Sequence, residues 1–325
     1  MNMKLAAKAA KRGGWFTRAD AISAGYSDAE IRSRVRQDQW VHLCQGAYAE
    51  RGAEESRTSW DRAIWRHIHA AKAVYDRLDG RAVVSHQSAL LLHGIEVSDL
   101  DLSRVHVTRL AGRGRSGPSL CQHAARPPVL EPVEVDRVLV TPGPRSVVEA
   151  IRWTPYPVAV SVVDAALRQR VATMDQLSEA LDLFSNRAGI RTAASAVGFG
   201  NGRSESIGES RLRVLLADLG LPAPVLQAEI RDASGALVAR VDFLLEPWGI
   251  VIEFDGAIKY AGSGADALIA EKRREDRIRD LGYEVVRVIW ADLAEPAELV
   301  GRLRRAIVRS RRHPGPLPGF STATA

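Results

Sequence analysis

Residues 240–259, which read RVDFLLEPWGIVIEFDGAIK, constrain the fold of this chain most, because they place acidic residues at the ends of two short apolar runs. The two runs read as strands, and Pro247-Trp248-Gly249 reads as the turn that joins them into a hairpin. Side chains alternate along a strand, so Glu253 and Asp255 point to one face. Neighbouring carboxylates repel each other, and a divalent cation neutralises them. The hairpin, which also carries Asp242, therefore predicts a metal site.

The stretch from Ser206 to about Leu303 resembles the Vsr-like (very-short-patch-repair) branch of the PD...(D/E)xK nuclease superfamily. The likeness rests on the order Asp, turn, Glu-x-Asp in the hairpin, on an opening helix at 208–213, on a charged helix after the hairpin, and on the closing run 282–292. The resemblance implies a restriction-endonuclease-like mixed sheet flanked by helices. It also implies that Mg²⁺ or Mn²⁺ is bound by three acids, which are Glu209, Asp242 and Glu253.

The activity implied by this resemblance is phosphodiester hydrolysis in DNA, in which the metal ion polarises the phosphate and lowers the pKa of a bound water. Asp255, a further candidate catalytic residue, stands where the superfamily's common pattern has Lys, and Lys259 stands where this branch often has His. A cation beside the acids stabilises the charge that develops during the reaction, and both Lys259 and Lys272 are candidates for this role. Arg273, on the same charged helix as Lys272, is a candidate phosphate contact.

An inactive version of this fold is the alternative. Asp242 and Asp255 also fit a purely structural role, because Asp commonly occupies strand ends beside turns. In that case the chain is a non-catalytic DNA-binding regulator or antitoxin, and the nuclease fold is kept only as a scaffold or binding platform.

The N-terminal region predicts a winged helix-turn-helix. Thr17 and Asp20 form a capping box that opens a short helix, and Ser27 and Glu30 form a second one that opens a helix over residues 28–37. A glycine turn separates the two helices. Two β fragments follow, at the positions where a wing is expected.

The second of these helices is the expected recognition helix. Its Arg32, Ser33 and Arg36 would face the major groove or its phosphates, and Gln39 and His42 would contact the DNA backbone from the wing. The charge distribution agrees, because residues 1–78 hold 14 Lys and Arg against 9 Asp and Glu, whereas residues 201–325 hold 18 of each kind. Basic side chains supply most of the sequence-independent affinity for DNA.

Residues 14–48 resemble the N-terminal winged-helix domain of AbiEi-type antitoxins from type IV toxin–antitoxin systems. The matching features are Phe16-Thr17, Gly25 and the closing Gly46-Ala47-Tyr48. This resemblance implies DNA as a partner and a cognate toxin protein as a second one. The alternative is a small helical packing domain whose arginines are solvated, since basic amphipathic helices are common.

The middle region, residues 57–197, predicts an α/β scaffold without a catalytic set. His86 and His93 lie seven residues apart on one expected helix, yet no third ligand stands at a fitting spacing, so we expect core histidines and no metal site. Cys44 and Cys121 are single and far apart, which predicts neither a disulfide nor a zinc site.

These patterns predict a multidomain α/β protein with a winged helix-turn-helix at 1–56, an α/β middle domain at 57–197, a nuclease-like domain at 204–310 and a disordered tail at 311–325. The Gly-rich segment 198–204 is the expected linker. No run of eighteen apolar residues and no hydrophobic signal core occur, so we expect a cytoplasmic protein without membrane association. The oligomeric state stays open.

Overall fold

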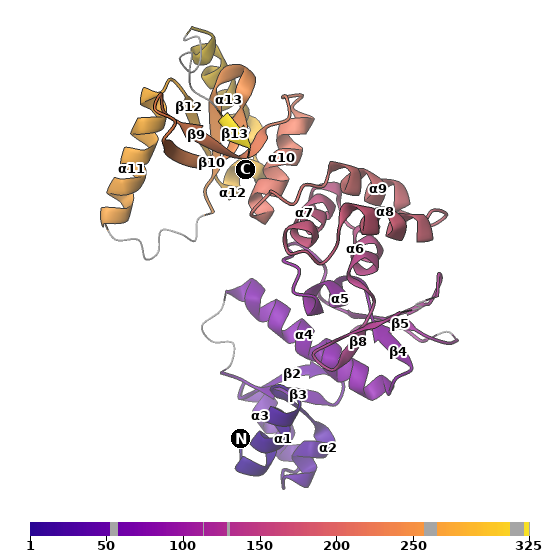
Figure 1. Cartoon of the computed structure of the whole chain (residues 1–325). Coiled ribbons are helices and arrows are strands. Elements are labelled where there is room, and N and C mark those ends of the chain that lie inside the picture. The colour runs from indigo at the N-terminus through magenta and orange to yellow at the C-terminus, as the bar shows by residue number, and fades with distance from the viewer. Residues whose placement is uncertain (53–57, 113, 129–130, 257–264, 313–321, 325) are drawn as a thin grey trace. The chain divides into compact units, whose positions relative to one another are not determined.

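The computed structural model describes residues 1–52, 58–112, 114–128, 131–256, 265–312 and 322–324, and side chains are left out at 265–268, 311–312 and 322–324. Two compact units make up the chain (Figure 1). The first comprises Met1–Pro155 and Arg170–Val197, and the second comprises Tyr156–Gln169 and Gly198–Ala325.

The first unit begins with the element order of a winged helix. The elements are α1 (Met3–Lys11), β1 (Trp15–Thr17), α2 (Arg18–Ser23), α3 (Asp28–Arg36), β2 (Trp40–Cys44) and β3 (Ala47–Glu50), and the strands form a sheet in the order β1-β3-β2. Both predicted capping boxes are present, at Thr17 and Asp20 for α2 and at Ser27 and Glu30 for α3. Phe16 and Trp40 are fully buried between the helices and the sheet, with ring centroids 4.7 Å apart.

The rest of the first unit is built on a second, five-stranded mixed sheet. Its elements are α4 (Ser59–Leu78), β4 (Ala82–Val84), α5 (His86–Leu92), β5 (Val105–Arg109), β6 (Leu120–Ala124), β7 (Val133–Val135), β8 (Val138–Val140), α6 (Gly143–Ile151), α8 (Met174–Leu183) and α9 (Ile190–Phe199). The strand order is β6-β5-β4-β8-β7, with β5 parallel to β6 and β4 parallel to β8. The sequence predicted one helix over 82–94. The structure corrects this, because residues 82–84 are buried as a central strand.

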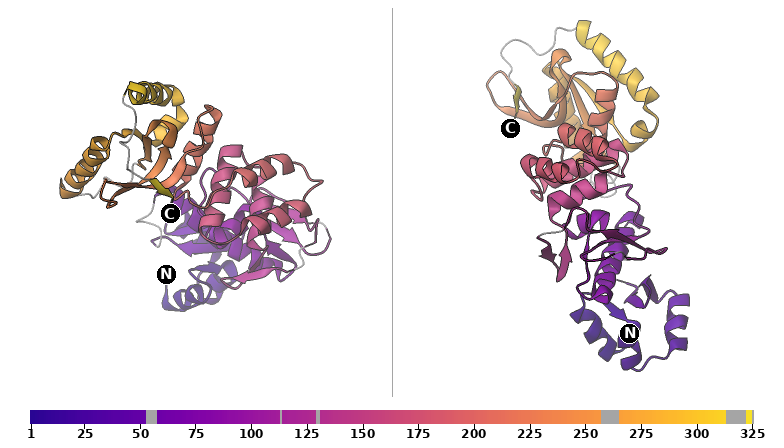
Figure 2. Two further views of the ribbon diagram at one scale, coloured as in Figure 1. Left: turned by 45° about the horizontal axis from the view of Figure 1, so that its top comes forward. Right: turned by 90° about the vertical axis from the view of Figure 1, so that its right-hand side faces the viewer.

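The second unit is a three-layer α/β/α domain. Its elements are α7 (Tyr156–Arg168), α10 (Ile207–Asp218), β9 (Val225–Arg231), β10 (Leu237–Leu245), the 3₁₀ turn η1 (Glu246–Trp248), β11 (Ile250–Phe254), α11 (Ala265–Asp280), β12 (Glu284–Val288), α12 (Trp290–Ala294), α13 (Pro296–Arg312) and β13 (Thr322–Thr324). The sheet order is β12-β11-β10-β9-β13, and β12 runs parallel to β11. Helices α10 and α13 lie on one face of this sheet and α11 lies on the other (Figures 1 and 2). Apolar residues of α10 and α13 pack on the first face, and Ile278 of α11 packs on the second.

The predicted hairpin is present at the centre of this sheet. Phe243 pairs with Ile252 and Leu245 pairs with Ile250 in antiparallel register, and Gly249 closes the turn with φ of 58°, a backbone conformation that glycine adopts without strain.

Parts of the segments expected as a linker and as a disordered tail make ordered contacts in the second unit. The expected linker is held in place, since the Asn201 N–H donates to Asp164, and the expected disordered tail contributes β13 along the edge strand β9. An edge strand offers unpaired N–H and C=O groups to such a segment.

Within the described residues, every helix falls short of the length and apolar character that crossing a bilayer requires.

Candidate functional site

Helix α3, the predicted recognition helix, buries one side and exposes the other. Ile31 is only 2% exposed and packs in the N-terminal core, whereas Arg32 and Arg36 are exposed and Ser33 is half-buried. Arg32 and Arg36 are four residues apart, so they lie on the same side of the helix. The helix therefore presents a pair of guanidinium groups to solvent.

The two candidate contacts from the wing are also exposed, and a residue that the sequence prediction omitted positions one of them. Arg34 donates a hydrogen bond of 3.0 Å from Nη1 to Oε1 of Gln39, while its guanidinium lies 5.1 Å and 5.4 Å from the ring centroids of Tyr26 and Trp40. His42 is exposed on β2, beside Tyr48. Arg34 thus connects the end of α3 to the start of β2.

The predicted nuclease acids lie at one end of the second unit's sheet. Glu209, the third residue of α10, is 5% exposed and accepts hydrogen bonds from the Glu205 N–H, the Ser206 hydroxyl and the Gln227 amide at 2.8, 2.8 and 3.1 Å. Burial, and secondly the negative charge of Asp242, raise the pKa of Glu209 to about 6.

The negative charge of Asp242 acts on both of the other acids. Its Oδ2 accepts a hydrogen bond of 2.8 Å from the Phe254 N–H, and its charge raises the pKa of both Glu209 and Glu253. Burial is the largest cause of the raised pKa of Glu253. Nη2 of Arg274 donates to Oε1 and Oε2 of Glu253 at 2.7 and 2.8 Å. A side-chain cation therefore lies beside Glu253, one of the three predicted metal ligands.

The three acids do not meet in one compact ligand set. In the part of the chain that the structure describes, one group of three or more His, Cys, Asp or Glu has ligand atoms all within 4.8 Å of one another, and it is a histidine group in the first unit. Oxygen ligands around Mg²⁺ at about 2.1 Å would lie closer together than that. The acids in this conformation therefore fit a bound metal ion less closely than the hairpin pattern implied.

The remaining predicted catalytic residues are placed as follows. Oδ2 of Asp255 lies 3.7 Å from Nη1 of Arg287, on the neighbouring strand β12. Lys259 lies outside the described residues. Lys272 and Arg273 are exposed on α11, whereas the half-buried Arg274 reaches Glu253. Successive residues of a helix point about 100° apart, so Lys272 and Arg273 do not share the direction in which Arg274 reaches Glu253. The sequence prediction therefore named two neighbours of the residue that makes this contact.

Gln227 is a further residue that the sequence prediction omitted. It is 5% exposed in β9, donates to Glu209, and has φ of 52°, which is uncommon for a residue other than glycine. The available signal was a single amide in the mostly apolar segment Val225–Ile230, whose other polar residue is Glu229. Unusual backbone conformations of this kind are often kept where a side chain must be held in one place.

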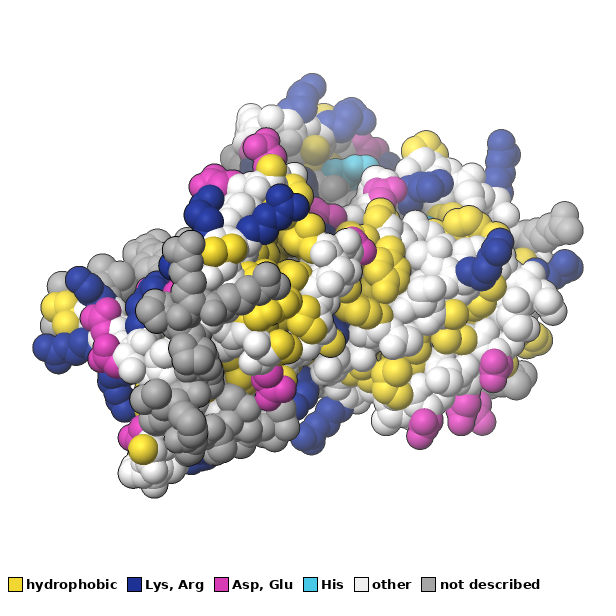
Figure 3. Space-filling model, turned by 90° about the horizontal axis from the view of Figure 1, so that it is seen from above, with side chains coloured by type: hydrophobic (Ala, Val, Ile, Leu, Met, Phe, Trp, Pro, Cys, Tyr) yellow, Lys and Arg dark blue, Asp and Glu magenta, His cyan; other side chains and the backbone are white. Residues whose placement is uncertain are grey.

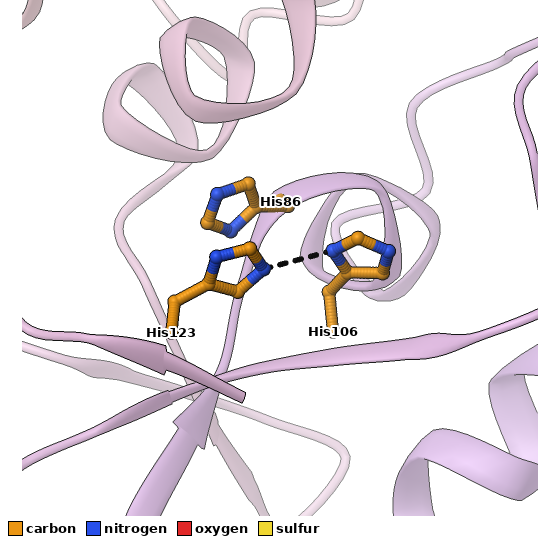
Figure 4. A group of neighbouring side chains, drawn as sticks. All are labelled: His86, His106 and His123. Atoms are coloured by element: carbon orange, nitrogen blue, oxygen red, sulfur yellow. Dashed lines mark hydrogen bonds between the residues drawn. The ribbon is translucent and has the colours of Figure 1, made fainter. Parts of the chain in front are cut away.

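A second cluster lies in the first unit, where the sequence predicted no metal site. His86 begins α5, His106 lies on β5 and His123 lies on β6, and their rings meet (Figure 4). Nδ1 of His106 is 3.0 Å from Nε2 of His123, and the rings of His86 and His123 stack with centroids 3.8 Å apart. His93, the partner considered from sequence, instead contacts the Thr141 carbonyl at 2.8 Å.

Comparison with known proteins identifies the N-terminal segment. Residues 3–51 match the family model described as "Transcriptional regulator, AbiEi antitoxin". This match confirms the similarity to AbiEi antitoxins that the sequence predicted for residues 14–48, and it ends before the second sheet.

Two relatives come from Mycobacterium tuberculosis. The uncharacterised protein MT2308 of strain CDC 1551 / Oshkosh is 28% identical over 258 residues, which is 76% of this chain and 93% of that protein, and the uncharacterised protein Rv2248 of strain H37Rv gives the same values. Among solved structures, the RV2827C protein from M. tuberculosis matches 66% of this chain and 79% of its own with 18% identity and a TM-score of 0.38. A similarity of that size carries no inference about fold or function.

Proposed function

We propose that this protein is a DNA-binding regulator of the antitoxin type, and that it contacts DNA through α3 and the β2–β3 wing. The observation that carries this proposal is the exposed basic face of α3 within a segment similar to AbiEi transcriptional regulators. A helix of this kind fits the major groove, with the guanidinium groups of Arg32 and Arg36 donating to base edges or phosphates.

The surroundings of α3 favour this role. Asp28, at the start of the helix, is paired with Arg18, and Glu30 accepts the capping-box hydrogen bond from the Ser27 N–H at 2.7 Å, so both nearby acids have partners. On the face drawn in Figure 3, Lys and Arg side chains are interspersed with Asp and Glu. Our candidate for the DNA contact is the basic face of α3, where Arg32 and Arg36 are exposed.

The proposed DNA contact predicts a specific mutational pattern. Arg32→Ala and Arg36→Ala should each weaken DNA binding in a mobility-shift assay and, where the arginine contacts a phosphate, lower the slope of log K against log salt by about 1. Arg191→Ala, which removes the same charge from an exposed position on α9, is the control and should bind as wild type does. If all three variants bound DNA with the affinity of wild type, α3 would be excluded as the contact.

A cognate toxin is the partner that the antitoxin similarity suggests. A co-purification test with the product of the neighbouring gene in the native operon checks this part of the proposal. A stable complex supports it, and separate elution of two folded proteins counts against it.

The second candidate function is metal-dependent DNA cleavage by the second unit. Its support is the electrostatic coupling of Asp242 to Glu209 and Glu253 in a domain with the order helix, three antiparallel strands, helix, parallel strand. Mg²⁺ or Mn²⁺ would supply phosphate polarisation and water activation. In the non-catalytic alternative, Arg274 neutralises Glu253 in place of a metal ion.

Plasmid cleavage decides between these alternatives. The assay compares wild type with Asp242→Asn and Glu253→Gln on supercoiled DNA with Mg²⁺ or Mn²⁺. Asp276→Asn, at an exposed position of α11, is the matched control. Metal-dependent nicking that is lost in the first two variants and kept in the control would support a nuclease. Absence of cleavage by folded protein that still shifts DNA would support the regulator alone.

A further inference from the structure

We propose that His86, His106 and His123 form a binding site for a divalent transition-metal ion, Zn²⁺, in the first unit. The site lies outside the DNA-contacting helix and outside the carboxylates of the second unit. The proposal of a zinc site therefore does not depend on the proposed function.

Three separate elements bring these imidazoles together. β5 and β6 are parallel and in a register that pairs His106 with Cys121 and Thr108 with His123, so the two histidines project from the same face of the sheet. α5 then brings the ring of His86 onto that of His123 (Figure 4). The histidines come from positions 17 to 37 residues apart in the chain, and a chance local sequence pattern does not account for their meeting.

The spacing of the nitrogens is close to what zinc requires. Tetrahedral Zn²⁺ with Zn–N bonds of 2.0–2.1 Å places its ligand nitrogens about 3.3 Å apart. Nδ1 of His106 and Nε2 of His123 are 3.0 Å apart, and one ligand atom of each of the three histidines lies within 4.8 Å of the others. Rotation of the stacked His86 ring and small shifts of the other two rings would complete a three-nitrogen site.

The hydrogen bonds around the rings fit the arrangement found behind metal-bound histidines. Nδ1 of His86 lies 3.0 Å from the Ser85 hydroxyl and 3.6 Å from the Glu149 carboxylate, which leaves Nε2 to face a metal ion. The Gln87 amide nitrogen donates to Nε2 of His106 at 2.9 Å and to the Asp101 carbonyl at 3.2 Å. A metal ion at Nδ1 of His106 would move the ring proton to Nε2, and the Gln87 amide would then turn its oxygen toward that N–H, because metal-ligating histidines usually donate their second N–H to an oxygen acceptor.

The histidines have unprotonated nitrogens available at neutral pH. Burial is the largest cause that lowers the pKa of His106 to about 3 and of His123 to about 4. Burial also holds the pKa of His86 well below its usual range. Neutral imidazole is the form that binds metal ions.

The site opens into a cavity of about 440 Å³, which leaves room for a fourth ligand. The cavity wall includes the three histidines together with Cys121, Asp101 and Arg104. The positive charges of Arg104 and Arg152 oppose a metal cation, and Asp101 contributes a negative charge near His106. A site with three histidines and one open position is the arrangement of catalytic zinc sites, in which the fourth position holds water or a substrate.

The backbone of one histidine of the cluster is in an uncommon conformation, and a buried hydroxyl group beside the cluster lacks a hydrogen-bond partner among the described residues. His86 has φ of 54°, an uncommon conformation for a non-glycine residue, in a buried position. The buried Thr108 hydroxyl, which pairs in register with His123, has no hydrogen-bond partner among the described residues. Strain and unsatisfied polar groups of this kind are typical of sites that hold a ligand.

Zinc titration of the full-length protein tests the proposal. After removal of metals with a chelator, wild type, His106→Gln and His123→Gln are titrated with Zn²⁺ in competition with a chromophoric indicator. Wild type should bind one Zn²⁺ that both substitutions weaken more than about 100-fold, beyond the effect of about 10- to 100-fold expected for the supporting variant Gln87→Ala. Co²⁺ should give the visible absorption of a tetrahedral site in wild type only.

The controls separate loss of the ligand from loss of the fold. His42→Gln, at the exposed histidine of the wing, should bind Zn²⁺ as wild type does. Circular dichroism verifies that each variant is folded, and His123→Gln, at the half-buried position, is the variant to use if His106→Gln unfolds. The proposal is overturned if folded wild type binds no Zn²⁺, or if a folded cluster variant binds it with wild-type affinity.

Discussion

Glu209 is an acid whose ionisation is opposed by its surroundings, even though it accepts three hydrogen bonds. Burial and the neighbouring Asp242 outweigh the donors from Glu205, Ser206 and Gln227, and so the pKa lies at about 6 instead of the usual 4.5. A group with a raised folded-state pKa stabilises the fold below its unfolded-state pKa, and that contribution is lost as the pH rises through the folded-state pKa.

Because the pKa of Glu209 is raised, the stability of the metal-free protein should fall as the pH rises. Between about pH 3 and about pH 8, wild type should lose about 2 kcal/mol of unfolding free energy relative to Glu209→Gln, because folding raises the pKa of Glu209 from 4.5 to about 6 and a tenfold change in proton affinity corresponds to about 1.36 kcal/mol. Urea unfolding at several pH values measures it. Glu298→Gln, at an exposed position of α13, should follow wild type, and a parallel pH profile for Glu209→Gln would contradict the prediction.

At the level of single elements, the start of α3 is held by its capping box. Ser27 accepts from the Glu30 N–H and Glu30 accepts from the Ser27 N–H, so two unpaired helix-end donors are satisfied. The same box, with Thr173 and Gln176, begins α8 in a part of the unit that is not proposed to contact DNA.

These two caps make a matched pair of variants. Ser27→Ala and Thr173→Ala should each lower the unfolding free energy by about 1 kcal/mol, because each removes an N-cap acceptor. Only Ser27→Ala should also weaken DNA binding, since it frays the proposed recognition helix. Chemical denaturation and mobility shifts measure the two effects, and equal loss of DNA binding in both variants would argue against a role for α3.

The contact between α7 and α10 includes a buried ion pair. Nη2 of Arg213 donates to Oδ2 of Asp164 at 2.9 Å and to the Phe199 carbonyl at 3.0 Å, and Asp164 is fully buried. Burial nevertheless raises the pKa of Asp164.

Removing one partner of this pair should cost far more than removing both. Arg213→Met leaves a buried carboxylate without its cation and should destabilise the second unit by about 3–5 kcal/mol. Arg213→Met combined with Asp164→Leu should recover much of that loss, which thermal unfolding of the single and double variants measures. Additive losses would show that the pair is not coupled.

At the scale of the whole molecule, the second unit is discontinuous in sequence. Residues 156–169 belong with residues 198–325, although residues 170–197 between them belong to the first unit. The predicted boundary at 198–204 separated α7 from the helix that it packs against. One division between the units falls at residue 198, where the glycine-rich segment begins, and that composition gave no indication of the earlier segment.

Fragments test this division. A fragment that begins at residue 156 retains α7 and should unfold cooperatively, whereas one that begins at residue 198 leaves Arg213 without Asp164 and exposes the apolar side of α10. Hydrogen exchange of the sheet amides should therefore be slow in the first fragment and fast in the second. Equal protection in both fragments would show that α7 is dispensable.

The sequence alone determined the features that depend on contacts within a few residues. The capping boxes at Ser27 and Thr17, the Gly249 turn and the basic face of α3 follow from backbone geometry and helix period, which neighbouring residues set. The tertiary structure decided which distant side chains meet. Arg274 instead of Lys272 reaches Glu253, and His106 and His123 meet His86 because β5 and β6 are parallel in one register. Strand register and helix phase bring these groups together, and neither is encoded in the local spacing of the residues concerned.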